Sequence, residues 1–458
     1  MLNDKMNALI DEVCSELAER EELVHTIALA LLTGKNLFVL GEPGQAKSQA
    51  IDLFRSHITG AKQFDILMSK GTDQEQLFGR LDLASIIPGH VSHTVLNRDP
   101  RYAQMRNRLA ELMDSAQDDR GYAEISELHG RMNRYKAALA LQHEGVPEMV
   151  TANKIPESHI CFLDEVFKAN DGVLNSLLKA LNERIYTNEG VSMSIPVISF
   201  FAASNEIPNF HNPEEKSLRA LYDRFDFKVC TRYVEDKANR MRILAMKQDP
   251  ANFVPDGFER ISGKEISLDE LYQMQEEVRA VKIPGSINEL ADNILCELRR
   301  KEISVTDRKY FNFGLVVQAE AWLAGRDTVQ PQDMKALVNY LWDKPEDREI
   351  VEEAITRLTE NPLGDKLDDL LARAYQCRDE FDSADSPGLA LIALRSGLLA
   401  LYDEAEQLKD SLAEDDPARS TVEGMIATLE GISREAHAKT AFTYLPLPEL
   451  KAFKQMSA

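Results

Sequence analysis

The sequence predicts an α/β fold built on a parallel sheet, followed by two all-helical domains. Short, almost wholly apolar runs at residues 36–40, 160–163 and 197–203 are typical of strands that are buried on both faces. Stretches with helical periodicity separate these runs, and such alternation indicates a doubly wound α/β core. After Cys230 the pattern is helical throughout, which predicts the helical domains.

The other elements of the core are placed by their periodicity and by the turn residues between them. In chain order they are expected at residues 2–33 (two helices), 48–57 (helix), 63–68 (strand), 172–183 (helix) and 184–197 (β-hairpin).

A different pattern occupies residues of about 90–145, where apolar side chains recur every three or four positions in two series. The series are Tyr102, Met105, Leu109 and Leu112, then Ile125, Leu128, Met132, Tyr135 and Leu139. Such seams predict two helices that pack against each other as an antiparallel hairpin.

The 458 residues exceed what one hydrophobic core usually holds, and about three domains are expected. We expect the α/β core at residues 1–233, including the helical hairpin at about 90–145. A helical lid-like domain is expected at 234–345, and a second, more acidic helical domain at 346–458.

Composition argues against several classes of protein. The sequence has no apolar run of 18 residues and no basic, apolar leader at its start, so no membrane segment and a cytoplasmic location are expected. Five scattered cysteines and nine histidines show no metal-binding spacing. A net charge of −23 argues against nucleic-acid binding by default, although a locally basic pore would escape this argument.

A glycine-rich segment lies between the first predicted strand and its helix, and reads Gly41-Glu42-Pro43-Gly44-Gln45-Ala46-Lys47-Ser48. In this context glycines let backbone N–H groups surround phosphates, and the helix N-terminus favours their negative charge. We expect Lys47 to reach the β- and γ-phosphates and Ser48 to offer its hydroxyl to Mg²⁺. Ala46 stands where a glycine usually precedes the lysine, which leaves an ordinary turn as the alternative.

Two acids follow the apolar run at 160–163. Asp164 at the carboxyl end of a strand beside the loop is expected to hold Mg²⁺, and Glu165 to polarise the attacking water. A helix cap is the alternative for this pair.

Three further polar residues complete the expected site. Asn205 follows the apolar run at 197–203 and would face the γ-phosphate and the water. Arg224 lies in a short segment before the last core strand, and Arg308 begins a helix of the following domain. Arg224 is expected to act as an arginine finger for a neighbouring subunit, where it would stabilise charge on the transferring phosphoryl group. Arg308 is expected to report the nucleotide state by closing on the phosphates. For both arginines a surface ion pair, with Asp223 or Asp307, is the alternative.

The segments Gly41–Ser48, Phe162–Ala169, Ala202–Glu206 and Leu221–Phe225 together resemble the MoxR branch of the AAA+ ATPases, particularly the RavA type, over residues of about 19–343. Alanine before the lysine is typical of this branch. The resemblance implies an AAA+ P-loop core with a helical lid, and ATP and Mg²⁺ as cofactors. It also implies a hexameric ring, chaperone-like action on a protein client, and a partner with a von Willebrand factor A (vWA) domain.

By the same resemblance, Lys47 and Ser48 belong to Walker A, and Asp164 and Glu165 to Walker B. Asn205 would be sensor 1, Arg224 the arginine finger and Arg308 sensor 2. The last 110 or so residues do not resemble those of RavA, so no partner is inferred from them.

Other interpretations stay open at this point. The hairpin at 90–145 is an arm that grips a partner, a regulatory prop, or a decoration that stabilises the subunit interface. A nucleic-acid translocase related to the MCM helicases shares the β-hairpin at 184–197, but its tip at 188–190 lacks basic residues. A nucleotide-gated scaffold is the third alternative.

Overall fold

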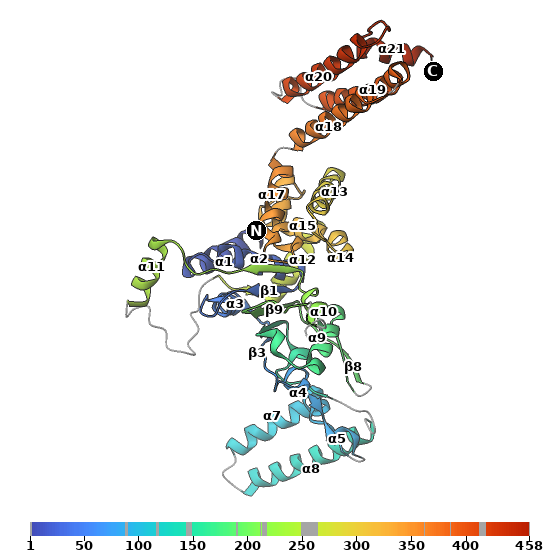
Figure 1. The fold of residues 1–458 in the computed structure, drawn as a ribbon. Helices are drawn as coiled ribbons and strands as arrows, with labels where there is room; N and C mark the ends of the chain where they lie inside the picture. The colour runs from blue at the N-terminus through green and yellow to red at the C-terminus, as the bar shows by residue number, and fades with distance from the viewer. Residues whose placement is uncertain are drawn as a thin grey trace. The chain divides into compact units, whose positions relative to one another are not determined.

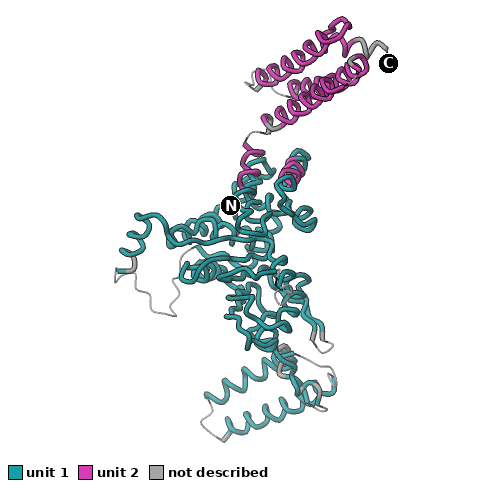
Figure 2. The backbone as a smooth tube through the Cα atoms, viewed as in Figure 1, with its two compact units in different colours: residues 1–289, 298–351 teal, residues 290–297, 352–458 magenta. Residues whose placement is uncertain are grey.

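The computed structural model of the chain divides into two compact units (Figures 1 and 2), residues 1–289 with 298–351 and residues 290–297 with 352–458. The residues that the structure describes are 2–87, 90–115, 119–142, 149–188, 191–210, 212, 218–248, 264–360, 362–384, 386–411 and 418–457. Residues 189 and 190, in the tip of the predicted β-hairpin, lie outside this set.

The first unit is built on a five-stranded sheet in the order β10-β1-β9-β6-β3, and all of its pairings are parallel. Its strands are β1 (Leu37–Leu40), β3 (Gln63–Leu67), β6 (Ile160–Asp164), β9 (Ser199–Ser204) and β10 (Phe227–Cys230). All six residues of the central strand β9 are buried, as expected of a strand covered on both faces. Because the strands are parallel, the loops after β1, β6 and β9 all leave the sheet at the carboxyl ends of its strands. We call this side of the sheet its carboxyl edge.

Helices cover both faces of this sheet. The helices are α1 (Leu2–Glu16), α2 (Glu21–Thr33), α3 (Lys47–Ser56), α9 (Asp171–Glu183) and α10 (Leu218–Tyr222). In β6, Cys161 and Leu163 join the hydrophobic cluster that contains Leu177 of α9, whereas Phe162 meets Arg55 of α3. This alternation follows from the two-residue period of a strand and confirms the predicted α/β core.

Short elements connect the core. They are β2 (Ile58–Thr59), α4 (Gln74–Phe78), β4 (Arg80–Leu81), α5 (Leu83–Ile86), α6 (His93–Arg98), β5 (Met149–Val150), η1 (Ile155–Glu157), η2 (Val166–Lys168), β7 (Ile185–Asn188) and β8 (Val191–Ser194). The antiparallel pair β7–β8 is the predicted β-hairpin. The stacked rings of Tyr186 and Phe78, 4.1 Å apart, attach it to α4.

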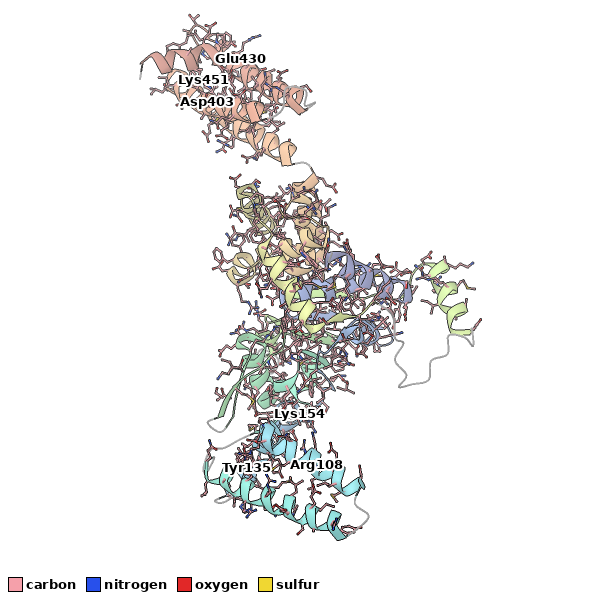
Figure 3. The ribbon with its side chains drawn as sticks, turned by 180° about the vertical axis from the view of Figure 1, so that it is seen from behind. Arg108, Tyr135, Lys154, Asp403, Glu430 and Lys451 are labelled. Atoms are coloured by element: carbon pink, nitrogen blue, oxygen red, sulfur yellow. The ribbon has the colours of Figure 1, made fainter. Side chains whose placement is uncertain are left out.

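The predicted helical hairpin is formed by α7 (Pro100–Ser115) and α8 (Asp119–Gln142). Leu112, Leu128 and Met132 form its buried seam. At its base, the Tyr135 hydroxyl on α8 donates a hydrogen bond to Asp99 over 3.1 Å. Arg108 on α7 pairs with Glu124 of α8 over 3.5 Å, and Figure 3 shows Tyr135 and Arg108 on the two helices.

Helices dominate the rest of the first unit, but one short ladder was not predicted. The strand β11 (Ile266–Ser267) pairs with β2 in parallel, and then α12 begins in a capping box made by Ser267 and Glu270. The helical elements are α11 (Lys237–Gln248), α12 (Leu268–Ala280), α13 (Gly285–Arg300), α14 (Asp307–Phe311), α15 (Gly314–Leu323), η4 (Pro331–Leu337), α16 (Val338–Leu341) and α17 (Asp347–Glu360). The division between the two units falls inside α13 and α17.

The second unit is an all-helical bundle. Its helices after α17 are α18 (Pro362–Asp382), α19 (Pro387–Ser411), α20 (Ala418–Ala438) and α21 (Leu447–Ser457). Leu398 of α19 and Leu429 of α20 are fully buried in its core. Lys451 of α21 lies 2.7 Å from Asp403 of α19 (Figure 3). Among the described residues of both units, no helix combines the length and apolar character needed to cross a bilayer.

Candidate nucleotide site

The loop between β1 and α3 turns sharply before the helix begins. Gly44 and Ala46 both adopt left-handed backbone conformations, with φ of 81° and 57°. Ala46 is the residue that departs from the common glycine, and a side chain in this region costs about 1–2 kcal/mol. The side chains of Glu42 and Pro43 are exposed, whereas Gln45 and Lys47 are buried. The loop therefore has an anchored side and an open side.

Gln45 provides the anchor. Its side-chain oxygen accepts a hydrogen bond of 2.8 Å from the Thr231 hydroxyl. Its carbonyl accepts one of 3.0 Å from Arg20, whose guanidinium also donates to the carbonyl of Arg232 over 2.7 Å. Sequence reasoning missed Arg20 and Thr231, because neither belongs to a motif and both are distant from the loop along the chain.

Lys47 lies at the centre of a polar cluster at the carboxyl edge of the sheet. Its ammonium donates to the carbonyls of Gly41 and Glu42, the latter over 3.1 Å, and to Asn205 Oδ1 over 2.9 Å. Burial lowers the pKa of Lys47, while the charges of Asp164, Glu165 and Glu42 oppose this shift. A bound polyanion such as a triphosphate would offset this cost of burial by its attraction to the Lys47 ammonium.

Asn205 connects Lys47 to Glu165. Its Oδ1 accepts from Lys47, and its Nδ2 donates to Glu165 Oε1. This is the only amide orientation that satisfies both neighbours, because an ammonium needs an acceptor and a carboxylate needs a donor. The structure thus brings together three of the residues predicted from the sequence.

The two acids at the carboxyl end of β6 are held in a tight turn. Glu165 has a left-handed backbone with φ of 53°, and its N–H donates to Asp164 Oδ1 over 3.0 Å. Lys168 lies 3.3 Å from Glu165 Oε2. Left-handed conformations of non-glycine residues concentrate at functional sites. The turn directs Glu165 to Asn205 at the edge of the sheet where the loop lies.

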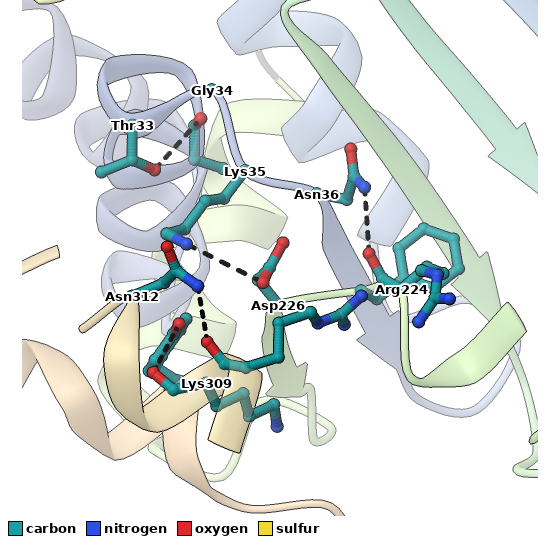
Figure 4. Close-up of polar contacts among 12 residues, drawn as sticks. Thr33, Gly34, Lys35, Asn36, Arg224, Asp226, Lys309 and Asn312 are labelled. Atoms are coloured by element: carbon teal, nitrogen blue, oxygen red, sulfur yellow. Dashed lines mark hydrogen bonds and ion pairs between the residues drawn. The ribbon is translucent and has the colours of Figure 1, made fainter. Parts of the chain in front are cut away.

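Arg224 and Arg308 lie together, but at the other edge of the sheet. Leu37 pairs with Phe227, so in space Arg224 lies beyond the amino end of β1. Lys47 lies beyond the carboxyl end of the same strand. The four residues of β1 span about 13 Å at roughly 3.3 Å each. Arg308 donates to the carbonyl of Asp223, and Asn36 donates to that of Arg224 over 2.9 Å (Figure 4). Neither arginine belongs to the Lys47 cluster of its own chain.

The donor set fits a nucleotide-bound Mg²⁺ better than a metal held by protein alone. In the described part of the chain, no three His, Cys, Asp or Glu side chains form a group that could hold a metal ion. Mg²⁺ commonly takes one or two protein ligands and completes its shell with phosphate oxygens and water. Ser48 and Asp164 are the residues available for that role.

Comparison with known proteins gives the site its family context. A model described as the MoxR domain in the MoxR-vWA-beta-propeller ternary systems matches residues 4–101 and 120–274, more than half of the chain. A second model, the AAA lid domain, matches residues 282–355. The lid match contains Arg308.

Similar proteins include two from Methanocaldococcus jannaschii, both uncharacterized. MJ0079 is 29% identical over 80% of this chain and 77% of its own length, and MJ0812 is 27% identical over 74% and 71%. The structural protein ORF618 of Acidianus two-tailed virus is 23% identical over 54% of this chain and 32% of its own.

The fold is also similar to a crystal structure from Cytophaga hutchinsonii of a candidate ATPase, with a TM-score of 0.52 at 17% identity, over 77% of this chain and 94% of that one. On the match of the MoxR and lid models, this chain belongs to the MoxR family of AAA+ ATPases.

Proposed function

We propose that this protein hydrolyses ATP with Mg²⁺ in a hexameric ring and uses the energy to remodel a protein partner. The observation that carries the proposal is the contact chain from Lys47 through Asn205 to Glu165 at the carboxyl edge of the sheet. A cation, a neutral amide and a carboxylate in this order suit phosphates on one side and a water on the other.

Each residue of the cluster receives one role in this proposal. The loop residues 41–46 and Lys47 would hold the phosphates, and Ser48 and Asp164 would hold Mg²⁺, which neutralises charge on the phosphate oxygens when bound. Glu165 would accept the proton of the attacking water. Asn205, already bonded to Glu165, would orient that carboxylate and the water.

The position of the two arginines supports a ring. Arg224 and Arg308 lie beyond the start of β1, about one strand length from the phosphate loop of their own chain. We infer that both serve the site of the neighbouring protomer, where an arginine finger accelerates phosphoryl transfer by about 10³–10⁵-fold. Arg308 then acts across the interface, and not by closing on the phosphates of its own chain.

A vWA protein is the proposed partner. The family model that matches this chain describes MoxR domains that occur with vWA and β-propeller proteins, and the motifs resemble the RavA type. The net charge of −23 supports a protein client over nucleic acid.

Three substitutions test the proposal. Lys47→Ala is expected to abolish ATP binding, because the buried cation is lost. Glu165→Gln is expected to bind ATP and retain it unhydrolysed. Arg224→Ala is expected to bind ATP normally while its kcat falls by about 10³-fold or more. Nucleotide binding and phosphate release would be measured on each purified variant, with and without DNA.

The controls replace exposed residues of the same types in the same unit. Lys62→Ala and Glu75→Gln alter side chains on the surface and are expected to leave both measurements unchanged. Hydrolysis at the parental rate by Glu165→Gln would refute the role of this acid. ATPase activity that depends on DNA would favour a translocase instead.

A further inference from the structure

Two buried lysines share one carboxylate inside the first unit. Lys228 of β10 and Lys309 of α14 are 0% and 2% exposed. Both donate to the same oxygen of Asp343, Oδ1, over 2.9 and 2.7 Å. Asp343 lies shortly after α16. This one acid therefore connects β10 of the core with α14, the helix that carries Arg308.

The remaining hydrogen bonds of the cluster go to backbone carbonyls. Lys228 donates to Phe225 over 3.1 Å and Lys309 to Trp342 over 3.2 Å. The Tyr222 hydroxyl donates to the carbonyl of Asp343 over 2.6 Å, and its ring lies 4.6 Å from the Lys228 ammonium. Carbonyls and a ring carry no full charge, so Asp343 is the one anion in contact with both ammonium groups among the described residues.

Electrostatics make this acid hard to replace. Burial and the nearby charge of Lys309 lower the pKa of Lys228. Burial raises the pKa of Asp343, but Lys309 and Lys228 outweigh it and hold this pKa well below its usual range. Removing the carboxylate charge would leave two buried cations close together without a counter-ion, which is strongly unfavourable.

The cluster joins the segments that carry the two arginines. Phe225, which accepts from Lys228, is the residue after Arg224. Lys309 is the residue after Arg308, which itself donates to the carbonyl of Asp223. The segment 223–225 and α14 are therefore connected twice, once by Arg308 and once through Lys309, Asp343 and Lys228. Figure 4 shows Arg224 and Lys309 at this edge of the sheet.

We propose that Asp343 is a positioning residue that holds Arg224 and Arg308 of one protomer in a fixed relation, so that both reach the nucleotide of the next protomer together. The inference rests on the proposed function, because it needs a site completed by a neighbour. Its energetic basis is that catalytic groups lose much of their effect when they are misplaced by about 1 Å.

The first test compares kcat with ATP affinity. Asp343→Asn keeps the shape of the side chain but loses its charge. We expect its kcat to fall by about 10- to 100-fold, with ATP affinity within about threefold of the parent, because the Lys47 cluster is untouched. Lys309→Met is the second variant: it leaves the Lys228–Asp343 pair intact, with its charge balanced, but removes the link from α14 to Asp343. It should show the same change in kcat while folding and assembling normally.

The matched control removes a lysine from an ion pair on the surface of the second unit. Lys439 lies 2.6 Å from Asp382, and both are exposed. Lys439→Met is expected to leave kcat and ATP affinity unchanged. Thermal melting and mass measurements on every variant identify those that fold and form rings, and Lys309→Met decides the test if Asp343→Asn does not assemble.

Mixed rings separate positioning from damage to a protomer's own site. Glu165→Gln subunits have intact arginines, and Asp343→Asn or Lys309→Met subunits have an intact site. In a random equal mixture about a quarter of the interfaces combine an intact site with intact arginines. We therefore expect a mixture with Glu165→Gln to recover roughly a quarter of the parental rate.

Glu165→Gln mixed with Arg224→Ala serves as the reference for this recovery. If that reference mixture stays inactive, the trans arrangement itself fails. If the reference recovers but the Lys309→Met and Asp343→Asn mixtures do not, or if these variants alone turn over at the parental rate, the positioning role of Asp343 is overturned.

Discussion

At the residue scale, the proposed phosphate loop depends on close packing at Gly41. A Cβ built on Gly41 would collide with the Thr231 hydroxyl and the Gln45 side-chain oxygen, and would lie 3.2 Å from the Thr231 carbonyl. Thr231 and Gln45 are the pair that anchors the loop. Glycine is required here for the close approach of its neighbours, because its φ is not in the left-handed region.

Gly41→Ala is expected to break the Thr231–Gln45 hydrogen bond and to destabilise the first unit by about 1–3 kcal/mol, as overpacked sites do. ATP affinity should fall as well, since the anchored side of the loop shifts. Denaturant unfolding and nucleotide titration measure the two effects. The control is Gly130→Ala in α8, where nothing lies within 4 Å of the added carbon and alanine favours the helix by about 0.5–1 kcal/mol. A Gly41→Ala protein as stable as its parent would contradict the packing argument.

Residues of the site differ in how far the sequence could predict them. Asp164 ends a buried strand, Glu165 and Asn205 directly follow one, and Lys47 begins the helix after one. Parallel strands bring their carboxyl ends to the same side of the sheet. Arg20 anchors the loop from 25 residues away, and no local pattern marks a single arginine as buried.

At the element scale, β10 and α14 show why the lysine cluster was not predicted. Lys228 occurs in Phe-Lys-Val-Cys, where a lysine between apolar residues normally points to solvent on an edge strand. It contacts Asp343, 115 residues later. A contact between residues so far apart produces no periodic pattern in the sequence. The two-residue ladder of β2 and β11 is also too short to produce one.

The cluster also makes the unfolding free energy of the first unit depend on pH in the acidic range. The lysines hold the pKa of Asp343 below its unfolded value of about 3.9. Its contribution to stability is therefore complete above the unfolded pKa, and it is lost as the pH falls through the folded pKa. We expect the difference in unfolding free energy between the parent and Asp343→Asn to shrink as the pH falls below about pH 4. At higher pH the difference also reflects the titration of Lys228, whose pKa burial and the charge of Lys309 lower to about 7.

Urea unfolding at a series of pH values measures this difference. Asp65→Asn is the control, because Asp65 is mostly exposed and lies 3.3 Å from Arg55. Such surface pairs contribute about 0–1 kcal/mol, so no comparable pH-dependent difference should appear. A difference between parent and Asp343→Asn that does not shrink below about pH 4 would contradict the assignment.

At the scale of the whole molecule, the proposed division of the site between protomers follows from the two ends of the sheet's strands. The Lys47 cluster lies at the carboxyl edge and the paired arginines at the other. The motifs predicted both groups from the sequence, but only the strand register separates them in space. On the proposed function, a protomer alone lacks arginines at its nucleotide site, and assembly should be required for rapid turnover.

The most direct test of this account is the rate of ATP turnover per protomer as a function of protein concentration, with the mass of the assembly measured on the same samples. We predict a low rate while the protein is monomeric, a steep rise as rings form and a plateau when assembly is complete. Arg224→Ala rings should stay at the low rate throughout. A rate per protomer that is the same for monomers and rings would contradict the shared site.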